Sequence, residues 1–324
     1  MSQQSYTVTE AQEGATLAAI LRQNLPEKSW TQVRSLVAQR LVQVDGSLCQ
    51  DPARRLHKEE IVEVLAKAAP VHRGGTVHDL VIRHLDAEVV VVEKPSGINT
   101  VRHPAEREWK QERRELSPTL EDLTQWAISK SLGKPVRDLH RLRIVHRLDK
   151  ETSGLVVFAR SANAERILGK QFHAHTVLRK YVAIVQGHPK SQTITSWLLR
   201  DRGDGRRGSG VSSQSGKQAI THVQVEETIG SYSIVSCMLE TGRTHQIRIH
   251  LAELGFPVCG EPVYRKKLDG SEIPDASQAP RLALHAMELG FQHPDGSTKH
   301  WTMELPLDLK GFVTHLKNQA QKAR

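Results

Sequence analysis

The chain has 324 residues, with 45 Lys and Arg against 36 Asp and Glu, and a formal net charge of +9. This length accommodates one large domain and a small one, and a basic balance in a folded chain favours polyanionic partners such as nucleic acid. The three scattered cysteines, at positions 49, 237 and 259, exclude a disulfide framework and a zinc knuckle, and they indicate a reducing environment.

The start of the chain lacks the features of a targeting segment. No Lys or Arg precedes Arg22, and two glutamates, Glu10 and Glu13, lie in this stretch. We therefore expect neither a signal peptide nor a transit peptide. The densest apolar run, residues 89–92, is too short to span a bilayer. The expected location is the cytoplasm, without a membrane anchor.

Residues 1–67 predict a small α/β domain. Leu17, Ile20, Leu21 and Leu25 have the spacing of one helix face, and Ser29 can cap a second helix over the following residues. The pair Asp45 and Gly46 between apolar residues predicts a tight hairpin, and residues 61–65 predict a further strand. Such a unit is close to the minimum size for independent folding.

The stretch SWTQVRSLVAQRLVQVDG resembles the small RNA-binding domain shared with a ribosomal small-subunit protein, the S-four type. One departure is the first helix, which reads ATLAAIL where members have an Arg-Leu-Asp stretch. Basic residues gather around the second helix and the hairpin: Lys28, Arg34, Arg40, Arg54 and Arg55. They could read an RNA backbone, although an ordinary solvated helix face would carry the same charges.

The segment 68–79 contains Pro and Gly with little apolar material, and it predicts a linker. From residue 80 to 324, strand patterns such as VVVVEKPSG, LVVFARS, KYVAIVQG, THVQVEE and YSIVSCMLE alternate with helices, one of them capped by Ser161. This order predicts an α+β domain with a mixed, largely antiparallel sheet. Residues 101–115 predict a solvated loop or short exposed helix, with an insertion that contacts nucleic acid as the less favoured alternative, and residues 200–210 predict a mobile surface loop.

The loop at 200–210 contains glycines at 203, 205 and 208 in a GxGxxG spacing. No apolar strand leads into this spacing and no helix follows it, so the sequence context of a dinucleotide site is missing. A nucleotide-dependent enzyme is therefore a remote interpretation of the chain.

Asp149 stands between Arg147 and Lys150 in HRLDKETSG, just ahead of the apolar run LVVFA. Neighbouring positive charge favours the ionised carboxylate, and such a group at the mouth of an apolar region can act as nucleophile or general base. An isolated Arg-Leu-Asp tripeptide is more often a capped turn or an ion pair. Gly154, which follows, allows backbone or ligand to come close.

A second polar stretch is TGRTHQIRIHLAELGFPVCGEPVY. Within it Arg248 can point inward while its neighbours do not, and a buried Arg needs an anionic partner, for which Asp149 is the best candidate. His245 and His250 have no third ligand at a convincing spacing, so a hydrogen-bonded core position is favoured over a metal site.

The same judgement applies to His173 and His175. Tyr181, in RKYVAIVQG, can either pack in the core or stack on a base.

Together these blocks resemble the RluA-type family of pseudouridine synthases. HRLDKETSG, RKYVAIVQG and GRTHQIRIHLAELGFPVCGEPVY occur in the family's order, accompanied by EKPSGI, GKQAITHVQV and RLALHAMELGFQHP, and the resemblance spans nearly all of residues 80–306. One departure is Glu261, where members have Asp. The resemblance implies a pseudouridine synthase fold and an isomerase that converts uridine in RNA to its C-glycoside isomer without metal or organic cofactor.

The resemblance also implies roles for four residues. Asp149 matches the catalytic aspartate, and Arg248 matches the arginine paired with it. Arg147 matches the arginine that occupies the space left by a flipped base. Tyr181 matches the tyrosine that holds the flipped base and is placed to assist proton removal from its carbon. A uridine inside folded RNA has to leave the stack to reach such a pocket.

The expected partner is RNA, most of all ribosomal RNA of the large subunit, with transfer RNA as the alternative, and the expected state is a monomer. A non-catalytic RNA-binding or ribosome-assembly factor is disfavoured because all four matched residues are present. A hydrolase that removes the base would need a water-activating acid or base beside Asp149.

Overall fold

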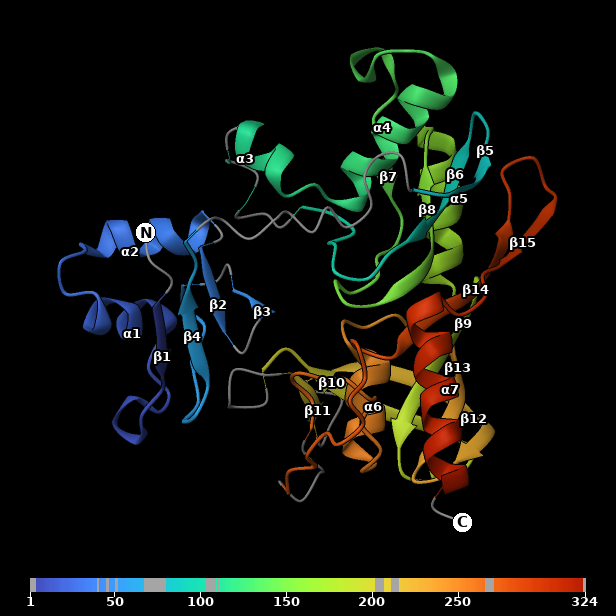
Figure 1. Ribbon diagram of the computed structural model, residues 1–324. Coiled ribbons are helices and arrows are strands. Elements are labelled where there is room, and N and C mark those ends of the chain that lie inside the picture. The colour runs from blue at the N-terminus through green and yellow to red at the C-terminus, as the bar shows by residue number, and fades with distance from the viewer. Residues whose placement is uncertain are drawn as a thin grey trace. The chain divides into compact units, whose positions relative to one another are not determined.

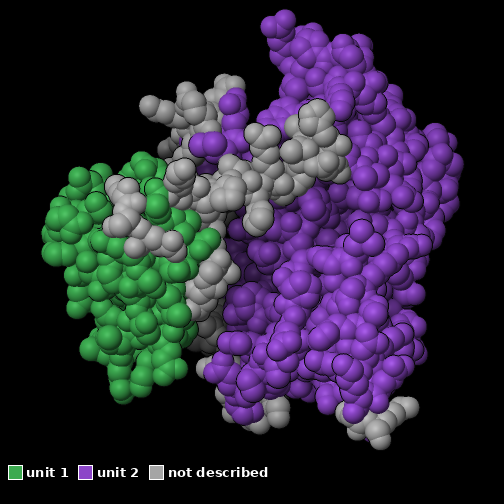
Figure 2. All heavy atoms as spheres, viewed as in Figure 1, with its two compact units in different colours: residues 1–72 green, residues 73–324 purple. Residues whose placement is uncertain are grey.

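The computed structural model describes residues 4–39, 41–44, 47–49, 52–66, 80–102, 106, 109, 111–201, 207–210, 216–265 and 271–322. The chain divides into two units, Met1–His72 and Arg73–Arg324, shown in green and purple in Figure 2. The expected linker, 68–79, lies outside the described residues, as do Arg40, Asp45 and Gly46.

The N-terminal unit has two helices and a 4-stranded antiparallel sheet in the order β1-β4-β2-β3 (Figure 1). Its elements are β1 (Gln4–Thr7), a 3-10 helix (Glu10–Gln12), α1 (Leu17–Asn24), α2 (Trp30–Ala38), β2 (Val42–Val44), β3 (Ser47–Leu48) and β4 (Ile61–Val64). The two predicted helices are confirmed, and Ser29 caps α2 by accepting from the Gln32 amide at 3.2 Å. The structure adds β1, which pairs with β4.

The second unit contains an 11-stranded sheet, with the main order β11-β10-β12-β13-β9-β14-β8-β6-β5; β15 pairs with β14, and β7 with β8. The strands are β5 (Ile82–Leu85), β6 (Val89–Lys94), β7 (Arg143–Ile144), β8 (Ser153–Ala159), β9 (Leu178–Gln186), β10 (Gln192–Leu199), β11 (Gly208–Gly210), β12 (Lys217–Ile229), β13 (Tyr232–Leu239), β14 (Leu284–Gln292) and β15 (Thr298–Thr302). Only β14 and β8, of the described pairs, run parallel. The prediction of an α+β fold with a mixed, largely antiparallel sheet is confirmed.

The helices of this unit are α3 (Gln111–Leu116), α4 (Leu120–Leu132), a 3-10 turn (Val136–Asp138), α5 (Ala162–His173), α6 (Gln246–Glu253) and α7 (Leu307–Lys322). Ser161 caps α5 as predicted. Leu168 of α5 packs with Val91 and Val157 in one core cluster, and Phe312 of α7 packs with Val235 in another. Within the described part of the chain, no helix is both long and apolar enough to cross a bilayer.

The end of the predicted loop at 200–210 is a strand. Residues 208–210 form β11 and pair with β10, because Gly210 can lie against the Leu199 side chain without a Cβ of its own. The glycines at 203 and 205 lie outside the described residues. Of the segment 101–115, the structure describes a helix start at Gln111, in agreement with a short helix, while most of 103–110 is outside the described set.

The parallel contact between β8 and β14 fixes the end of the loop that precedes β8. Gly154 pairs with Ala286 and has a φ of +129°. A Cβ at this position would overlap the Ala286 backbone. The glycine therefore allows the close backbone approach that the sequence predicted, and it sets where the segment of Asp149 enters the sheet.

Candidate active site

The loop that carries Asp149 lies between β7 and β8, and the segment after β6 holds it by its backbone. The Lys94 ammonium is fully buried and donates to the carbonyl oxygens of Pro95, Lys150 and Thr152 at 3.0, 2.9 and 2.7 Å. Burial lowers the pKa of Lys94 to about 7, against the opposing charges of Glu151 and Asp149. Lys94 thus satisfies buried carbonyls on both sides of the turn.

Other residues of the same segment add to this anchoring. The Thr100 hydroxyl donates to the Leu148 carbonyl at 2.8 Å and accepts from the Leu148 amide at 3.1 Å. The Ser96 hydroxyl donates to the Glu151 carbonyl at 2.6 Å, and the Gly97 amide donates to the carbonyl of Lys150 at 2.9 Å. The sequence block EKPSGI therefore fixes the backbone of the Asp149 turn by hydrogen bonds.

Arg248, from α6, meets two carboxylates. Its Nη1 lies 3.6 Å from Oδ2 of Asp149, so the predicted partner is in reach. Its Nε and Nη2 donate to the Glu261 carboxylate at 2.7 and 2.6 Å, a bidentate pair in which the two side chains are 5% and 1% exposed. Burial opposes the charge of Arg248, but the hydrogen bonds and charge of Glu261, with Asp149, raise the pKa of Arg248 above its ordinary value. The main partner, Glu261, was not predicted.

Glu261 is itself fixed by the chain around it. Its Oε1 accepts from the backbone amides of Val263 and Tyr264 at 2.9 and 3.1 Å. The Tyr264 ring lies under the Arg248 guanidinium, whose Cζ is 5.2 Å from the ring centroid. The Arg248 guanidinium is therefore hydrogen-bonded along its edge to the Glu261 carboxylate and packed on one face against the Tyr264 ring.

His245 is a second group beside Asp149. Its Nε2 lies 3.7 Å from Oδ1 of Asp149, and its Nδ1 lies 2.7 Å from the Tyr264 hydroxyl. Burial, with Arg248, lowers the pKa of His245, and burial raises the pKa of Tyr264 to about 12. A protonated Tyr264 can donate to Nδ1, which assigns the tautomer that directs Nε2–H at Asp149. His245 has a left-handed φ of 60° at the start of α6, which directs its ring out of the helix.

Tyr181 lies within β9 and is buried. Burial raises the pKa of its phenol to about 12; the charge of Arg179 opposes this increase, and the charge of Asp149 adds to it. Its phenol is therefore protonated at neutral pH. Arg147 is exposed, while its neighbour Leu148 is buried. The structure thus brings Asp149 together with Arg248, places Tyr181 within the electrostatic reach of Asp149, and leaves Arg147 on the surface beside them.

The expectation that Arg248 alone points inward is wrong. Residues 246–252 of α6 are all buried, because polar members of the helix find partners in the sheet. The Gln246 amide donates to the Ile220 carbonyl and the Thr221 hydroxyl at 2.9 and 3.0 Å. A helix that is surrounded on all sides has no polar face for a pattern to reveal.

His250 hydrogen-bonds through both ring nitrogens, to the hydroxyls of Ser196 and Thr221 at 2.9 Å each, and burial lowers its pKa to about 4. The prediction of a core histidine is confirmed for His250. It is wrong for His173 and His175, which are exposed at the end of α5 and just beyond it. Within the described residues, neither His245 nor His250 belongs to a group of three metal-binding side chains.

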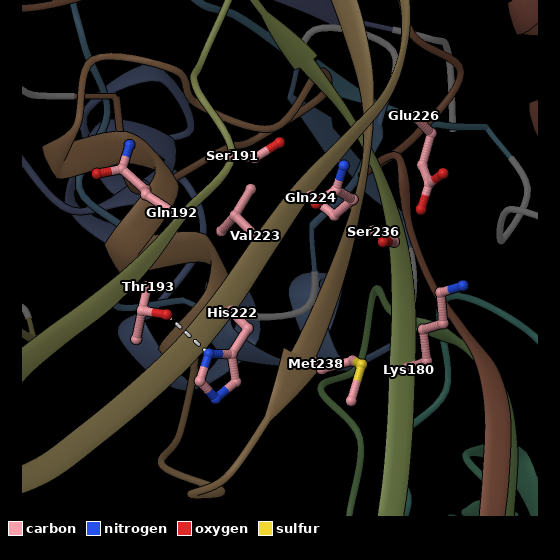
Figure 3. A pocket seen from close by; sticks show the side chains of 10 residues that line it. All are labelled: Lys180, Ser191, Gln192, Thr193, His222, Val223, Gln224, Glu226, Ser236 and Met238. Carbon is pink, nitrogen blue, oxygen red and sulfur yellow. Dashed lines mark hydrogen bonds between the residues drawn. The ribbon is translucent and has the colours of Figure 1, made fainter.

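An open hollow lies elsewhere on the sheet (Figure 3). Its lining comes mainly from β9, β10, β12 and β13 and is mostly polar, with Lys180 and His222 beside the apolar Met238. Lys180 pairs with Met238 across β9 and β13, one register position from the pair of Tyr181 and Cys237. Because strand residues alternate between faces, this hollow opens on the face opposite to Tyr181. It is therefore separate from the site around Asp149.

Comparisons with known proteins show the family to which the chain belongs. The family described as RNA pseudouridylate synthase matches residues 88–253. A protein of Zymomonas mobilis named ribosomal large subunit pseudouridine synthase D is 32% identical over 315 residues, which are 96% of each chain. A Bacillus subtilis protein named as an uncharacterized RNA pseudouridine synthase is 33% identical over 322 residues, 98% of this chain and 99% of the relative.

Among solved structures, human RNA pseudouridylate synthase domain containing 4 shares the fold, with a TM-score of 0.57 and 22% identity over 73% of this chain and 92% of its own. The chain belongs to the family of RNA pseudouridine synthases, which are isomerases. Within that family it is of the RluA type, as its ordered motifs predicted.

Proposed function

We propose that this enzyme isomerises specific uridines of large-subunit ribosomal RNA, with Asp149 as its catalytic carboxylate. The observation that carries the catalytic assignment is the position of Asp149, 3.6 Å from a buried guanidinium and on a turn anchored by Lys94. Relatives from Zymomonas mobilis and Nitrosomonas europaea, each 32% identical, are named for the large ribosomal subunit, and this supports the choice of target. Transfer RNA is the alternative.

The isomerisation of uridine needs one carboxylate. It does not need a second acid or base to activate a water molecule, as hydrolysis would. The bond between N1 of the base and the anomeric carbon breaks, and a bond from C5 to that carbon forms, while C5 loses a proton and N1 gains one. Asp149 either attacks the anomeric carbon or removes a ribose proton to give a glycal. In both routes water must stay out, since it would release the free base.

The surroundings of Asp149 fit these tasks. Arg248, oriented by Glu261, has its Nη1 3.6 Å from Oδ2 of Asp149, and Oδ1 of Asp149 lies 3.7 Å from Nε2 of His245. Tyr181, protonated at neutral pH, offers a buried ring and a hydroxyl donor to the flipped uracil. Arg147, exposed next to Asp149, is placed to enter the RNA as the uridine leaves it.

The N-terminal unit is proposed as an S-four-like RNA-binding domain. Trp30 is 50% exposed on α2, and Arg34, one helical turn further, is exposed as well. An exposed aromatic ring beside a guanidinium can stack on a base while it neutralises a phosphate. In contrast, Arg54 is engaged by Glu60 at 2.6 Å and is less available to RNA.

The experiment that tests the proposal is pseudouridine mapping, by carbodiimide-dependent stops, of total ribosomal and transfer RNA. It compares cells with the gene intact, deleted, or replaced by the Asp149→Asn form. We expect positions in large-subunit RNA to be lost in both altered strains. Loss in transfer RNA instead would support the alternative target.

With purified protein, Asp149→Asn should fold and bind RNA but lower the single-turnover rate by at least about 10³-fold, as removal of a reacting group does. Turnover near the wild-type rate would remove Asp149 from the catalytic role. Release of free uracil would identify a hydrolase. An Asp149→Asn strain that lacks every modification but keeps all other phenotypes of the intact gene would revive the assembly-factor hypothesis.

A further inference from the structure

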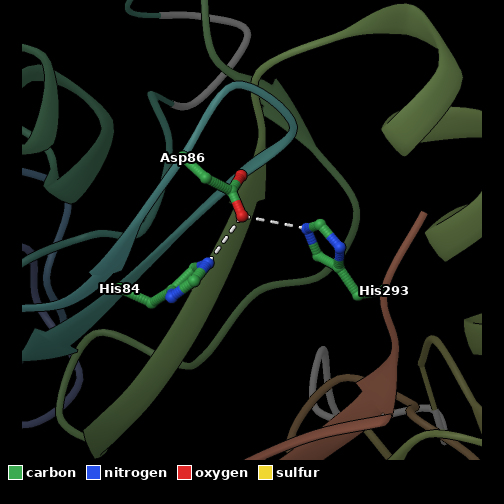
Figure 4. Close-up of side chains that lie close together, drawn as sticks. All are labelled: His84, Asp86 and His293. Carbon is green, nitrogen blue, oxygen red and sulfur yellow. Dashed lines mark hydrogen bonds and ion pairs between the residues drawn. The ribbon is translucent and has the colours of Figure 1, made fainter. Parts of the chain in front are cut away.

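Three metal-ligating side chains meet at the edge of the large sheet, away from the segments that carry Asp149 and Arg248 (Figure 4). His84 belongs to the edge strand β5, Asp86 follows directly after it, and His293 follows the end of β14. Their ligand atoms all lie within 4.8 Å of one another. The proposed chemistry uses none of the three. His293 lies in the block RLALHAMELGFQHP, to which the sequence analysis assigned no role, and His84 and Asp86 lie outside all the blocks.

Asp86 stands at the centre of the group. Its Oδ1 accepts from the backbone amides of Glu88 and Val89, both at 2.8 Å, which fixes the carboxylate. Its Oδ2 is left for the imidazoles and lies 2.6 Å from Nε2 of His84 and 3.0 Å from Nε2 of His293. Tetrahedral zinc with bonds of 2.0–2.2 Å would keep its ligand atoms about 3.3 Å apart, so small rotations suffice to admit the ion.

His293 supplies an independent indication that a ligand belongs here. Its side chain is 5% exposed, and its Nε2 is buried without a hydrogen bond, despite the close approach of Asp86. Its Nδ1 lies 3.0 Å from Oδ1 of Asp295, and the amide of Asp295 lies 3.3 Å from the same nitrogen. Nδ1 can accept from the Asp295 amide or, when it carries the proton, donate to the nearer Asp295 carboxylate. In the second tautomer the lone pair of Nε2 is free for a metal ion, and a carboxylate on the other ring nitrogen is the usual support of a metal-bound imidazole.

We propose that His84, Asp86 and His293 bind one divalent transition-metal ion of the zinc type, with water completing the coordination. Two imidazoles and one carboxylate favour zinc over magnesium or calcium, which prefer oxygen ligands. The side chains of His84 and Asp86 are 26% and 31% exposed, so an ion and a water molecule can enter.

The ion would join two elements that already pack together. Trp301 of β15 lies in one core cluster with Val89, and its ring centroid is 5.5 Å from that of His84. Arg83 of β5 donates to the Thr302 carbonyl at 3.2 Å. A metal at this point would tie the otherwise unpaired side of β5 to the β14–β15 hairpin, and its role is structural, not catalytic.

The test uses the full-length, untagged protein after removal of metal by a chelator. Zn²⁺ is titrated in competition with a chromophoric chelator, and thermal unfolding is followed with and without the ion. We expect one ion per chain and a higher unfolding temperature with Zn²⁺, and a visible spectrum of tetrahedral type when Co²⁺ replaces it. His84→Ala and His293→Gln should each weaken binding at least tenfold and remove the thermal shift.

The matched control is His300→Ala, which removes a histidine of β15 that faces only one carboxylate, Glu288, at 3.1 Å. It should bind Zn²⁺ as the wild type does. His84 is partly exposed on an edge strand, so its variant should fold, and circular dichroism checks this. No Zn²⁺ binding or thermal shift in the wild type, or equal binding by the wild type and both site variants, would overturn the proposal.

Discussion

Arg248 divides its guanidinium unequally between two carboxylates. Glu261 takes two short hydrogen bonds in the buried interior, whereas Asp149 has one contact of 3.6 Å. The tight pair fixes the plane of the guanidinium, and the loose one leaves Asp149, 17% exposed, able to meet a substrate. We therefore regard Glu261 as a positioning residue, which acts on the reaction through Arg248.

Glu261→Gln tests this view at the level of one atom. The amide cannot accept both N–H groups of Arg248, so the arginine loses its orientation and keeps an unbalanced buried charge. We expect the free energy of unfolding to fall by about 3 kcal/mol and the single-turnover rate to fall more than tenfold. Urea unfolding and rapid-quench assays on a uridine-containing transcript measure the two effects.

Glu261→Asp is the control, because it keeps the charge and is the residue of the RluA-type pattern at this position. It should restore most of the rate that Glu261→Gln loses, whereas Arg248→Ala should be as inactive as the Gln variant or more so. If Glu261→Gln turns over like the wild type, the bidentate pair is incidental to catalysis.

The residues around Asp149 were only partly predictable. The pairing of Asp149 with Arg248 followed from the rule that a buried Arg needs an anion. Glu261 could have been found by the same rule, since it stands 13 residues after Arg248 and departs from the family pattern. Lys94 gave no local signal, because the carbonyl groups of Lys150 and Thr152 lie far away in the chain and only the folded sheet brings them to its ammonium.

At the scale of elements, the spacing of apolar residues predicted the helices and strands that have one buried face and one face exposed to solvent. α1, α2 and α5 have such faces, and so does β4, whereas β6 and β8 are buried at nearly every residue and were predicted from their apolar runs. α6 is buried on all sides, so its sequence could be read as helix or strand. β11 consists of Gly, Ser and Gly, a composition that predicts a loop, because its pairing with β10 depends on tertiary contacts.

Three histidines, of which His250 and His285 are buried and His146 is partly buried, join elements of the second unit. His250 links α6 to β10 and β12, His285 of β14 hydrogen-bonds Ser153 of β8 at 2.9 Å, and His146 accepts from the Val157 amide at 3.0 Å. Burial lowers the pKa of His250 and of His285 to about 4, and that of His146 to about 3. All three imidazoles therefore stay neutral in the folded protein at pH values well below 6.5, the ordinary pKa of histidine.

These lowered pKa values predict a loss of stability in acid. Between pH 6.5 and about 4 the unfolded chain binds protons at these histidines and the folded chain does not, so the free energy of unfolding falls as the pH falls. A pKa that differs by one between the folded and unfolded chain corresponds to about 1.4 kcal/mol, so we expect a decrease of several kcal/mol across this window. Urea unfolding at pH 7.5, 6.5, 5.5 and 4.5 measures it.

His250→Gln keeps hydrogen-bonding capacity but cannot titrate, so its stability should depend less steeply on pH than that of the wild type. A free energy of unfolding that stays constant from pH 7 to 4.5, or the same slope in the variant, would contradict this account.

At the scale of the whole molecule, the two units have separate cores. One cluster consists of residues between Val8 and Val64, and the remaining clusters begin at Val89. Each unit therefore has the apolar interior that independent folding requires. In contrast, the residues that we propose for the isomerisation all belong to the second unit.

Removal of residues 1–67 should separate RNA binding from catalysis. We expect weaker binding to large structured RNA and a smaller dependence of binding on salt, because phosphate contacts are lost. The single-turnover rate on a short favourable fragment should stay near that of the full chain. Filter binding at several salt concentrations and rapid-quench assays measure the two.

Arg34→Glu in the full chain is the matched variant, since it reverses one exposed charge of α2 without removing the unit. It should reproduce part of the binding defect. Equal affinity and salt dependence of the truncated and full-length proteins would reject an RNA-binding role for the N-terminal unit.

The way in which the Asp149 turn is anchored has a use for protein engineering. Lys94, Ser96 and Thr100 grip carbonyl oxygens, which every amino acid provides. The side chains of Arg147 and Lys150 are exposed to solvent and take no part in that grip. Lys150 can therefore be randomised in a library to seek activity on other RNA contexts while the Asp149 carboxylate keeps its position, and Arg147 is kept because we propose that it enters the RNA.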